Sequence, residues 1–146
     1  MALITTAAYA LFPLGHFESA QSYVNEGASL FRSLKDPFWS AVAQTFVGVF
    51  ALHRGNLAAA RENFAKGLAG LQNYAETYYA NIARSGLADV FRLQGEYDRS
   101  TSLYIETIKA WRVLGNLGAV PATWNVWALL LWRRPKSSRP LSARPN

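Results

Sequence analysis

Apolar and small residues recur along this chain in a pattern that predicts pairs of helices. In three segments these positions follow one another at steps of 3, 4, 4, 3 and 3 residues, which only an α-helix gathers on one face. Matching positions lie 40 residues apart: Phe17, Leu57 and Tyr97; Ala20, Ala60 and Ser100; Val24, Phe64 and Tyr104; Ala28, Leu68 and Ile108; Phe31, Leu71 and Trp111; Leu34, Tyr74 and Leu114. We therefore expect a repeat protein, because such a unit buries its apolar face only by stacking on its neighbours.

Glycines with the same spacing divide each unit into two helices. Gly15, Gly55 and Gly95 each precede one of these segments, and small residues such as Gly48 and Ala88 lie in the segment before a glycine. Glycine adopts the left-handed conformation that ends a helix at the lowest steric cost. Each unit is therefore predicted to consist of helix A, a glycine turn and helix B, and small residues on helix A allow two backbones to approach closely.

Helix boundaries follow from capping residues. Asp36-Pro37 places a capping acid before a proline at the first helical position, so a helix should begin at Pro37. The pattern predicts an all-α domain over 2–134, with units near 2–36, 37–76 and 77–116 and a half unit at 117–134. The seven expected helices lie near 2–13, 17–34, 37–53, 57–73, 77–93, 97–114 and 118–133.

The chain resembles the tetratricopeptide (TPR) repeat family over roughly residues 3–134. The resemblance rests on the helix A rows, the glycine turns, the apolar residue two positions after each glycine and the small residue three beyond it. It implies a right-handed α-solenoid of antiparallel helix pairs. Units of 40 residues exceed the usual 34 and resemble the TPR region of MalT-like bacterial signal-transduction ATPases and transcriptional regulators, as do the segments NFAKGLAGL, LYIETIKAWRVLGN and GAVPATW.

Charge is concentrated at the end of the chain. The formal net charge is +6, but five of the 15 basic residues lie in the last fourteen positions, so the remaining chain carries ten basic and nine acidic residues. No helical face forms the basic stripe that follows phosphates. The segment 135–146 is rich in proline, serine and arginine and is expected to be a disordered tail. Weak binding of nucleic acid or an acidic surface by this tail is the alternative.

Two uncharged stretches are explained by the repeat rather than by targeting. Residues 1–17 lack the basic start of a secretory signal, and glycine, proline and asparagine interrupt residues 113–132. We expect neither a signal peptide nor a membrane span. Because cysteine is absent, a disulfide framework and a thiolate metal site are excluded, and a cytoplasmic location is expected.

The repeat stops within the fourth unit. Trp124 occupies the TPR position often held by tryptophan, but Pro135 replaces the next turn glycine, so helix 118–133 is expected to lack a helix B. Its apolar residues would then be exposed. A piece of a longer array and a homodimer through the terminal helices are both compatible with this pattern.

Catalytic, cofactor and metal-binding motifs are not found. His16 and His53 lack the spacing that places two metal ligands on one helical face, and no phosphate-binding glycine loop occurs. Glu62 and Lys66 have the helical i, i+4 order of a solvated ion pair. We expect no enzymatic activity, no cofactor and no metal.

The resemblance instead implies a binding groove along the helix A face. The positions that it transfers are Tyr9, Phe12, Thr45, Val49, Leu52, His53, Ser85, Asp89, Arg92, Asn125, Leu129 and Trp132. Their mixture of aromatic and polar side chains suits a bound peptide or helix; the alternative is that several of them only pack against the next helix. The leading hypothesis is a protein-protein interaction module, alone or as the sensor region of a regulator. The second is a nucleic-acid-associated protein that uses its tail.

Overall fold

A computed structural model describes residues 16–74 and 77–115 of the chain, and these residues form five α-helices. The helices are α2 (Phe17–Ser33), α3 (Pro37–His53), α4 (Leu57–Leu71), α5 (Tyr78–Leu93) and α6 (Tyr97–Val113). Each lies within two residues of a predicted helix. The described part of the chain is all-α, as expected; the helices predicted at 2–13 and 118–133 lie outside it.

Side-chain caps fix the start of three helices. The Asp36 carboxylate accepts a hydrogen bond from the Trp39 amide at 3.0 Å, with Pro37 at the first helical position, as the sequence predicted. Asn56 caps α4 through the Ala59 amide, and Thr77 caps α5 through the Ala80 amide. Each cap satisfies an amide that has no helical partner, which stabilises a helix start by about 1 kcal/mol.

The turns within units 2 and 3 use the predicted glycines. Gly55 and Gly95 have φ of +75° and +82°. After Gly55, the Asn56 amide donates to the Ala51 carbonyl at 2.9 Å, which closes the helix end. The turn between α2 and α3 has the same geometry but places Lys35 at φ +53°, so a residue with a side chain adopts the conformation that favours glycine.

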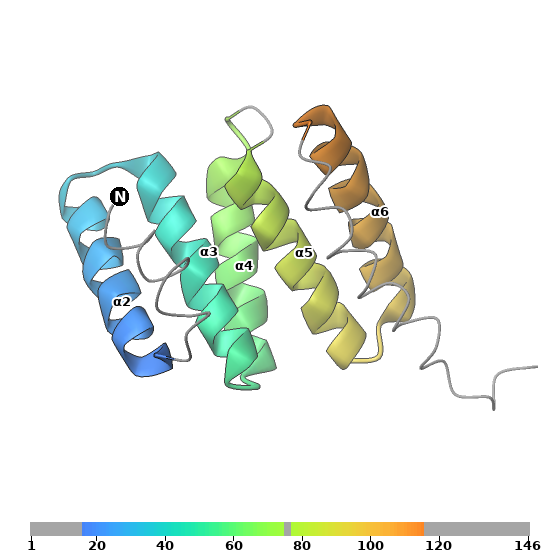
Figure 1. Cartoon of the computed structure of the whole chain (residues 1–146), viewed down its shortest axis with the longest axis horizontal. Coiled ribbons are helices and arrows are strands. Elements are labelled where there is room, and N and C mark those ends of the chain that lie inside the picture. Colours follow the sequence, from blue (N-terminus) through green and yellow to red (C-terminus); the bar gives the residue numbers. More distant parts are fainter. Residues whose placement is uncertain (1–15, 75–76, 116–146) are drawn as a thin grey trace, which may run out of the picture.

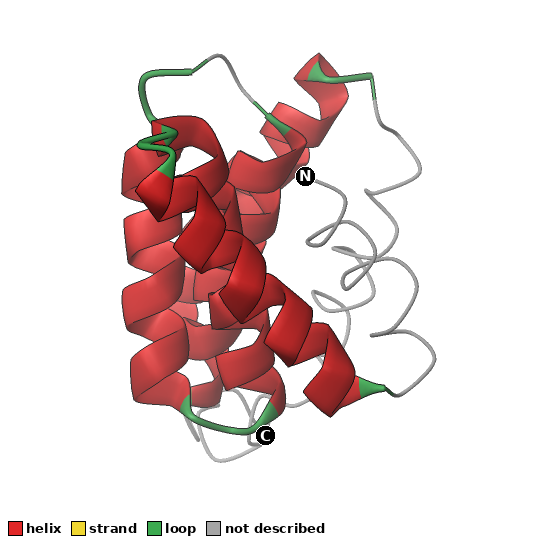
Figure 2. Cartoon of the chain, turned by 90° about the vertical axis from the view of Figure 1, so that its left-hand side faces the viewer, coloured by secondary structure: helices red, strands yellow, loops and turns green. Residues whose placement is uncertain are grey.

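The helices stand side by side and alternate in direction (Figure 1). Each packs against its neighbours in sequence, most extensively α3 against α4, and α3 also contacts α5. The C-terminal ends of α2, α4 and α6 and the N-terminal ends of α3 and α5 lie along one edge of the row, at the top of Figure 1. Figure 2 shows the same helices from the side, with short connections between them.

The buried rows of helix B differ in part from the predicted stripe. The rows of Ala20, Val24 and Phe31 and their equivalents are buried in all three units, as predicted. The row Leu34, Tyr74 and Leu114 is exposed, and that part of the prediction is wrong because these residues follow the last helical turn. A row that the sequence reading missed, Gly27, Gly67 and Thr107, is buried instead.

Small residues on helix A make room for one aromatic ring. A Cβ atom built on Gly48 would lie 2.8 Å from the Phe64 ring, and one built on Gly86 would lie 2.3 Å from it. Phe64 of α4 therefore fills the space between α3 and α5, which links units 2 and 3. This finding agrees with the expected close approach at the small residues of helix A.

Candidate protein-binding face

One row of α5 carries polar side chains that are half-buried. Ser85, Asp89 and Arg92 follow at steps of four and three residues, so they lie on one face of the helix. The Ser85 hydroxyl donates to the carbonyl oxygens of Asn81 and Ile82, at 2.9 and 3.1 Å. The Ser85 hydroxyl is therefore satisfied within α5. Asp89 and Arg92 carry the charges of this row and are the residues that a partner could contact.

Asp89, Arg92 and Tyr104 form a polar cluster between α5 and α6. The Tyr104 hydroxyl donates to Asp89 Oδ1 at 2.6 Å, and Arg92 Nη2 lies 3.3 Å from the same oxygen. The Asp89 and Arg92 side chains are 26% and 23% exposed. Because both contacts fall on Oδ1, Asp89 Oδ2 can accept a hydrogen bond from another donor.

The electrostatics of the polar cluster favour a neutral tyrosine. Burial raises the pKa of the Tyr104 hydroxyl well above its usual value, and the negative charge of Asp89 adds to this rise. Tyr104 therefore stays protonated at neutral pH and acts as a hydrogen-bond donor. The cluster thus holds a carboxylate and a guanidinium in place beside a neutral hydroxyl group.

Arg92 is incompletely paired within the described residues. Its Nε atom is buried and has no hydrogen-bond partner there, and its contact with Asp89 involves one nitrogen only. A guanidinium carries five N–H donors. The buried Nε is closed to a partner, but the Nη groups interact only with Asp89 and Tyr104 among the described residues, so part of their donor capacity is unused there. The pair thus combines a carboxylate oxygen with unused donors at a half-buried position.

The equivalent row of α3 is apolar or buried. Thr45 is fully buried, and its hydroxyl donates to the Ala41 carbonyl at 3.1 Å, so its assignment to the binding surface is wrong for this structure. The reason is close helix packing, since a Cβ built on Gly67 would lie 2.3 Å from Thr45 Oγ1. Val49 is half-buried and packs against both parts of the core.

The remaining predicted positions divide between described and undescribed residues. His53 is exposed, and its ring centroid lies 4.1 Å from that of Phe17 in α2. Leu52 is half-buried against the core residues of α4 and α5. Tyr9, Phe12, Asn125, Leu129 and Trp132 lie outside the described residues.

A charged and aromatic cluster that the sequence reading missed lies at the turn between α5 and α6. Guanidinium groups of Arg61 and Arg99 lie 5.0 and 5.6 Å from the centre of the Phe91 ring, in cation-π contact. Glu96 pairs with Arg61 at 3.7 Å and with Arg99 at 2.7 Å. A hollow of about 450 Å³ adjoins this cluster and is lined by Phe91, Asp98, Arg99, Ser102 and Leu103.

The two arginines join three helices, but no pattern in the sequence marks them. They come from α4 and α6, while the ring belongs to α5, so sequence distance hides the cluster. Because Glu96 already neutralises both cations in part, the cluster is better explained as a contact between units 2 and 3. The sequence indicates only the Glu96–Arg99 ion pair, through its i, i+3 spacing, and gives no sign that Arg61 and Phe91 lie beside it.

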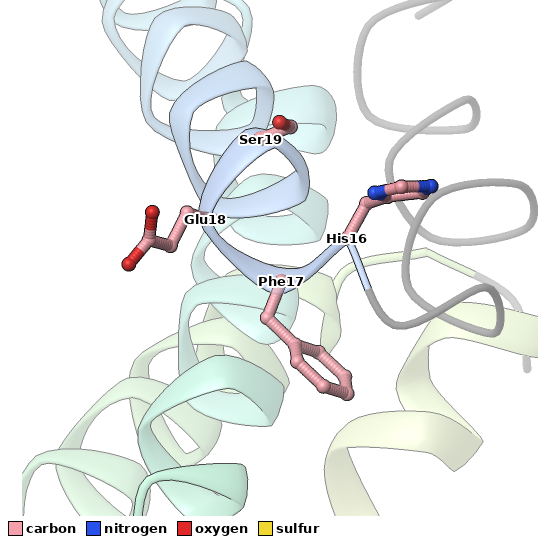
Figure 3. Close-up of a pocket in the computed structure, with 4 residues that line it drawn as sticks. All are labelled: His16, Phe17, Glu18 and Ser19. Atoms are coloured by element: carbon pink, nitrogen blue, oxygen red, sulfur yellow. The ribbon is translucent and has the colours of Figure 1, made fainter.

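A second hollow, of about 390 Å³, lies at the start of α2. His16, Phe17, Glu18 and Ser19 line it, and Figure 3 shows their side chains directed in different directions around the first helical turn. A nucleophile, a base and an orienting group must converge to act together, and these four side chains do not. The histidine is therefore best explained as a surface residue.

Two further kinds of feature were not found among the described residues: a cluster of metal ligands and a membrane-spanning helix. Within 16–74 and 77–115, no group of three histidine, aspartate or glutamate side chains is placed to hold a metal ion. None of the five helices is both long and apolar enough to cross a membrane. Glu62 and Lys66 form the solvated pair expected from their spacing, with Nζ and Oε1 2.6 Å apart and both side chains exposed.

Comparisons of the chain with family models, curated proteins and solved structures found no match. The assignment of function therefore depends on the geometry of this chain's own residues. Among the described side chains, the polar row of α5 combines partial burial with charged groups whose hydrogen-bonding capacity is only partly used.

Proposed function

We propose that the chain is a right-handed TPR-like α-solenoid that binds a peptide or protein partner along the helix A face of α3 and α5. The 40-residue recurrence of left-handed turns and buried rows supports the solenoid. The resemblance to MalT-like proteins supports a role as the sensor region of a cytoplasmic signalling or transcriptional regulator. Stacked helix pairs create extended surfaces of the kind that such scaffolds use for binding.

The main support for the proposal is that α5 has charged residues at positions where α3 has apolar residues. Asp89 and Arg92 stand where the preceding unit has Val49 and Leu52. In α3, apolar side chains pack at these positions, so the fold does not require charged residues there. A partly buried charged pair is also not more stabilising than apolar residues that pack well. Contact with a partner's polar groups accounts for the presence of both charges.

The chemistry of the pair fits a peptide. Asp89 Oδ2 can accept a hydrogen bond from a peptide N–H, and the unused donors of Arg92 can bind a carbonyl or carboxylate oxygen. Val49, half-buried on α3, adds apolar contact area on the same face. The expected ligand is therefore a segment that presents main-chain polar groups beside an apolar side chain.

Site-specific photo-crosslinking tests the proposal in cells that produce the protein. A photoreactive amino acid replaces Ser85, in the polar row, or Lys66, which is exposed on α4 and serves as the control position. We expect a discrete crosslinked protein from position 85 and none from position 66. A synthetic peptide from the crosslinked region should then bind the purified chain, about tenfold more weakly after Arg92→Ala and unchanged after Lys66→Ala.

Two results would contradict the proposal. The same proteins crosslinked from both positions would mean that the helix A face is not selected. A peptide affinity that Asp89→Ala and Arg92→Ala leave unchanged would mean that the charged pair does not contact the partner. Circular dichroism of each variant separates loss of binding from loss of helical structure.

A further inference from the structure

A continuous set of aromatic contacts runs along one edge of the row of helices. At this edge each helix B ends and the next helix A begins. We call these rings and the exposed side chains beside them the aromatic edge; the rings are Phe31, Phe38, Trp39, Tyr74, Tyr78, Tyr79 and Trp111, of which Phe31 and Trp111 are buried. Phe31 stacks on Trp39 at 5.7 Å, Trp39 meets Tyr79 at 5.8 Å, and Tyr78 meets Trp111 at 5.1 Å between ring centroids. The contacts thus connect α2 with α6 through the ends of α3 and α5 (Figure 1).

Apolar side chains at one position of the repeat are exposed at this edge in all three units that the structure describes there. Leu34, Tyr74 and Leu114 occupy the same position of the 40-residue repeat, and their exposed fractions are 64%, 38% and 38%. Tyr78 and Val113 extend the row and are also exposed. Isolated exposed apolar residues are ordinary, but a row that recurs in three units at the same helix ends as the aromatic contacts indicates an interaction surface.

Basic residues flank the row, and the described acid beside it is already engaged. Arg32, Lys35 and Arg112 are exposed at or just after the last turns of α2 and α6, and none of them forms an ion pair with a described acidic residue. Among the described residues, the acceptors of Arg32 are the Ala28 carbonyl at 3.2 Å and the Ser29 hydroxyl at 3.5 Å. Asp36 accepts from the Trp39 amide, so its carboxylate serves as a helix cap.

We propose that the aromatic edge binds an acidic segment of a partner protein whose leucine or phenylalanine side chains lie on the row Leu34, Tyr74 and Leu114. The basic residues select an acidic ligand by charge complementarity. The aromatic rings provide a rigid apolar base that loses little conformational entropy on binding. This surface lies at the helix ends, so it is separate from the helix A face proposed above and does not depend on it.

The rings form a fixed base on which a peptide can lie. Phe38 contacts Tyr74 edge-on at 4.9 Å, and Tyr78 contacts Trp111 in the same manner, so these rings are held against one another. Leu34 and Val113 protrude from the same edge, so binding to a lipid surface is the outcome that the vesicle measurement below distinguishes from peptide binding.

Isothermal titration calorimetry with defined peptides tests the proposal. The probe is a short, terminally blocked peptide in which glutamate alternates with leucine and phenylalanine; the control peptide carries lysine at each glutamate position. We expect the glutamate peptide to bind and the lysine peptide not to bind. Leu34→Ser and Leu114→Ser should each weaken binding about tenfold, and the combined change Arg32→Gln, Lys35→Gln and Arg112→Gln should weaken it by a similar factor.

Leu93→Ser is the matched control. Leu93 is also exposed, at 50%, but it is the last residue of α5, which ends at the opposite edge of the row. It should leave the affinity unchanged. The proposal is overturned if the glutamate peptide does not bind, if the lysine peptide binds equally well, or if Leu93→Ser weakens binding as much as Leu34→Ser does. Binding to vesicles of anionic phospholipid without binding to the glutamate peptide would also overturn it.

Discussion

Replacing the polar cluster by the apolar residues of the preceding unit tests whether its charges serve stability or recognition. The changes are Asp89→Val, Arg92→Leu and Tyr104→Phe, which copy Val49, Leu52 and Phe64. The structure places both sets at equivalent positions of antiparallel helix pairs. A difference in stability therefore reflects the polar groups themselves rather than a difference in fold.

The expected magnitudes follow from the contacts. Tyr104→Phe removes a 2.6 Å hydrogen bond to a carboxylate, which contributes about 1.5–2 kcal/mol. Asp89→Val should destabilise more, by about 2–3 kcal/mol, because it leaves the fully buried Tyr104 hydroxyl without an acceptor and Arg92 without its carboxylate. Removing one partner of a fully buried ion pair would destabilise the fold more. The effect is smaller here because about a quarter of the Asp89 side chain is exposed to solvent.

The triple variant should behave differently from the sum of the single changes. When all three polar groups are replaced, no donor or acceptor of the cluster is left unsatisfied. We expect its free energy of unfolding to lie within about 1 kcal/mol of the wild type, or above it. The single and triple variants would then show a coupling of about 2 kcal/mol or more, as expected for side chains in direct contact.

Urea denaturation followed by circular dichroism measures these values. Tyr97→Phe is the matched control on the same helix, because Tyr97 is exposed, and it should change the free energy of unfolding by less than about 0.5 kcal/mol. A triple variant as unstable as the sum of the single variants would refute the assignment of the two hairpins as equivalent. An Asp89→Val variant as stable as Tyr97→Phe would show that the cluster does not form.

Four further predictions concern backbone conformation, packing and pH. Gly67→Ala should lower stability by about 1–3 kcal/mol, measured by the urea midpoint, because the added Cβ has no space between α3 and α4. Lys35→Gly should raise the melting temperature, since it relieves a left-handed residue at a gain of about 1 kcal/mol. Asp36→Ala should cost about 1 kcal/mol and Asp36→Asn much less, because asparagine retains the cap. The raised pKa of Tyr104 contributes stability that is present below its ordinary pKa of 10.0 and is lost as the pH rises above that value, so the urea midpoint should fall in alkali, and less so in Tyr104→Phe.

The sequence predicted the helices because their signals are local and repeated. Asp36-Pro37, Gly55 and Gly95 each act on the adjacent backbone, and each has its expected role in the structure. The left-handed turn at Lys35 was not predicted, because lysine gives no sign of that conformation. Its repeat equivalent, Gly115, also has positive φ, so the position in the repeat carried the signal that the residue type lacked.

Which face of each helix is open was harder to predict, because exposure depends on neighbouring helices. Thr45 occupies a groove position by its resemblance to the TPR pattern, but Gly67 lets α4 approach closely enough to bury it. Ser85, at the same position of the next unit, stays half-buried. The packing partners that decide between these outcomes are more than twenty residues away in the chain.

The triple variant also separates folding from recognition. If Asp89 and Arg92 are present for a partner, copying Val49 and Leu52 into α5 should preserve or raise stability and at the same time abolish the peptide affinity identified by crosslinking. If they are present for folding, stability and affinity should fall together. The apolar hairpin α3–α4 already demonstrates that this arrangement of helices packs without the two charges, so loss of affinity in a fully stable variant would assign them to the binding surface.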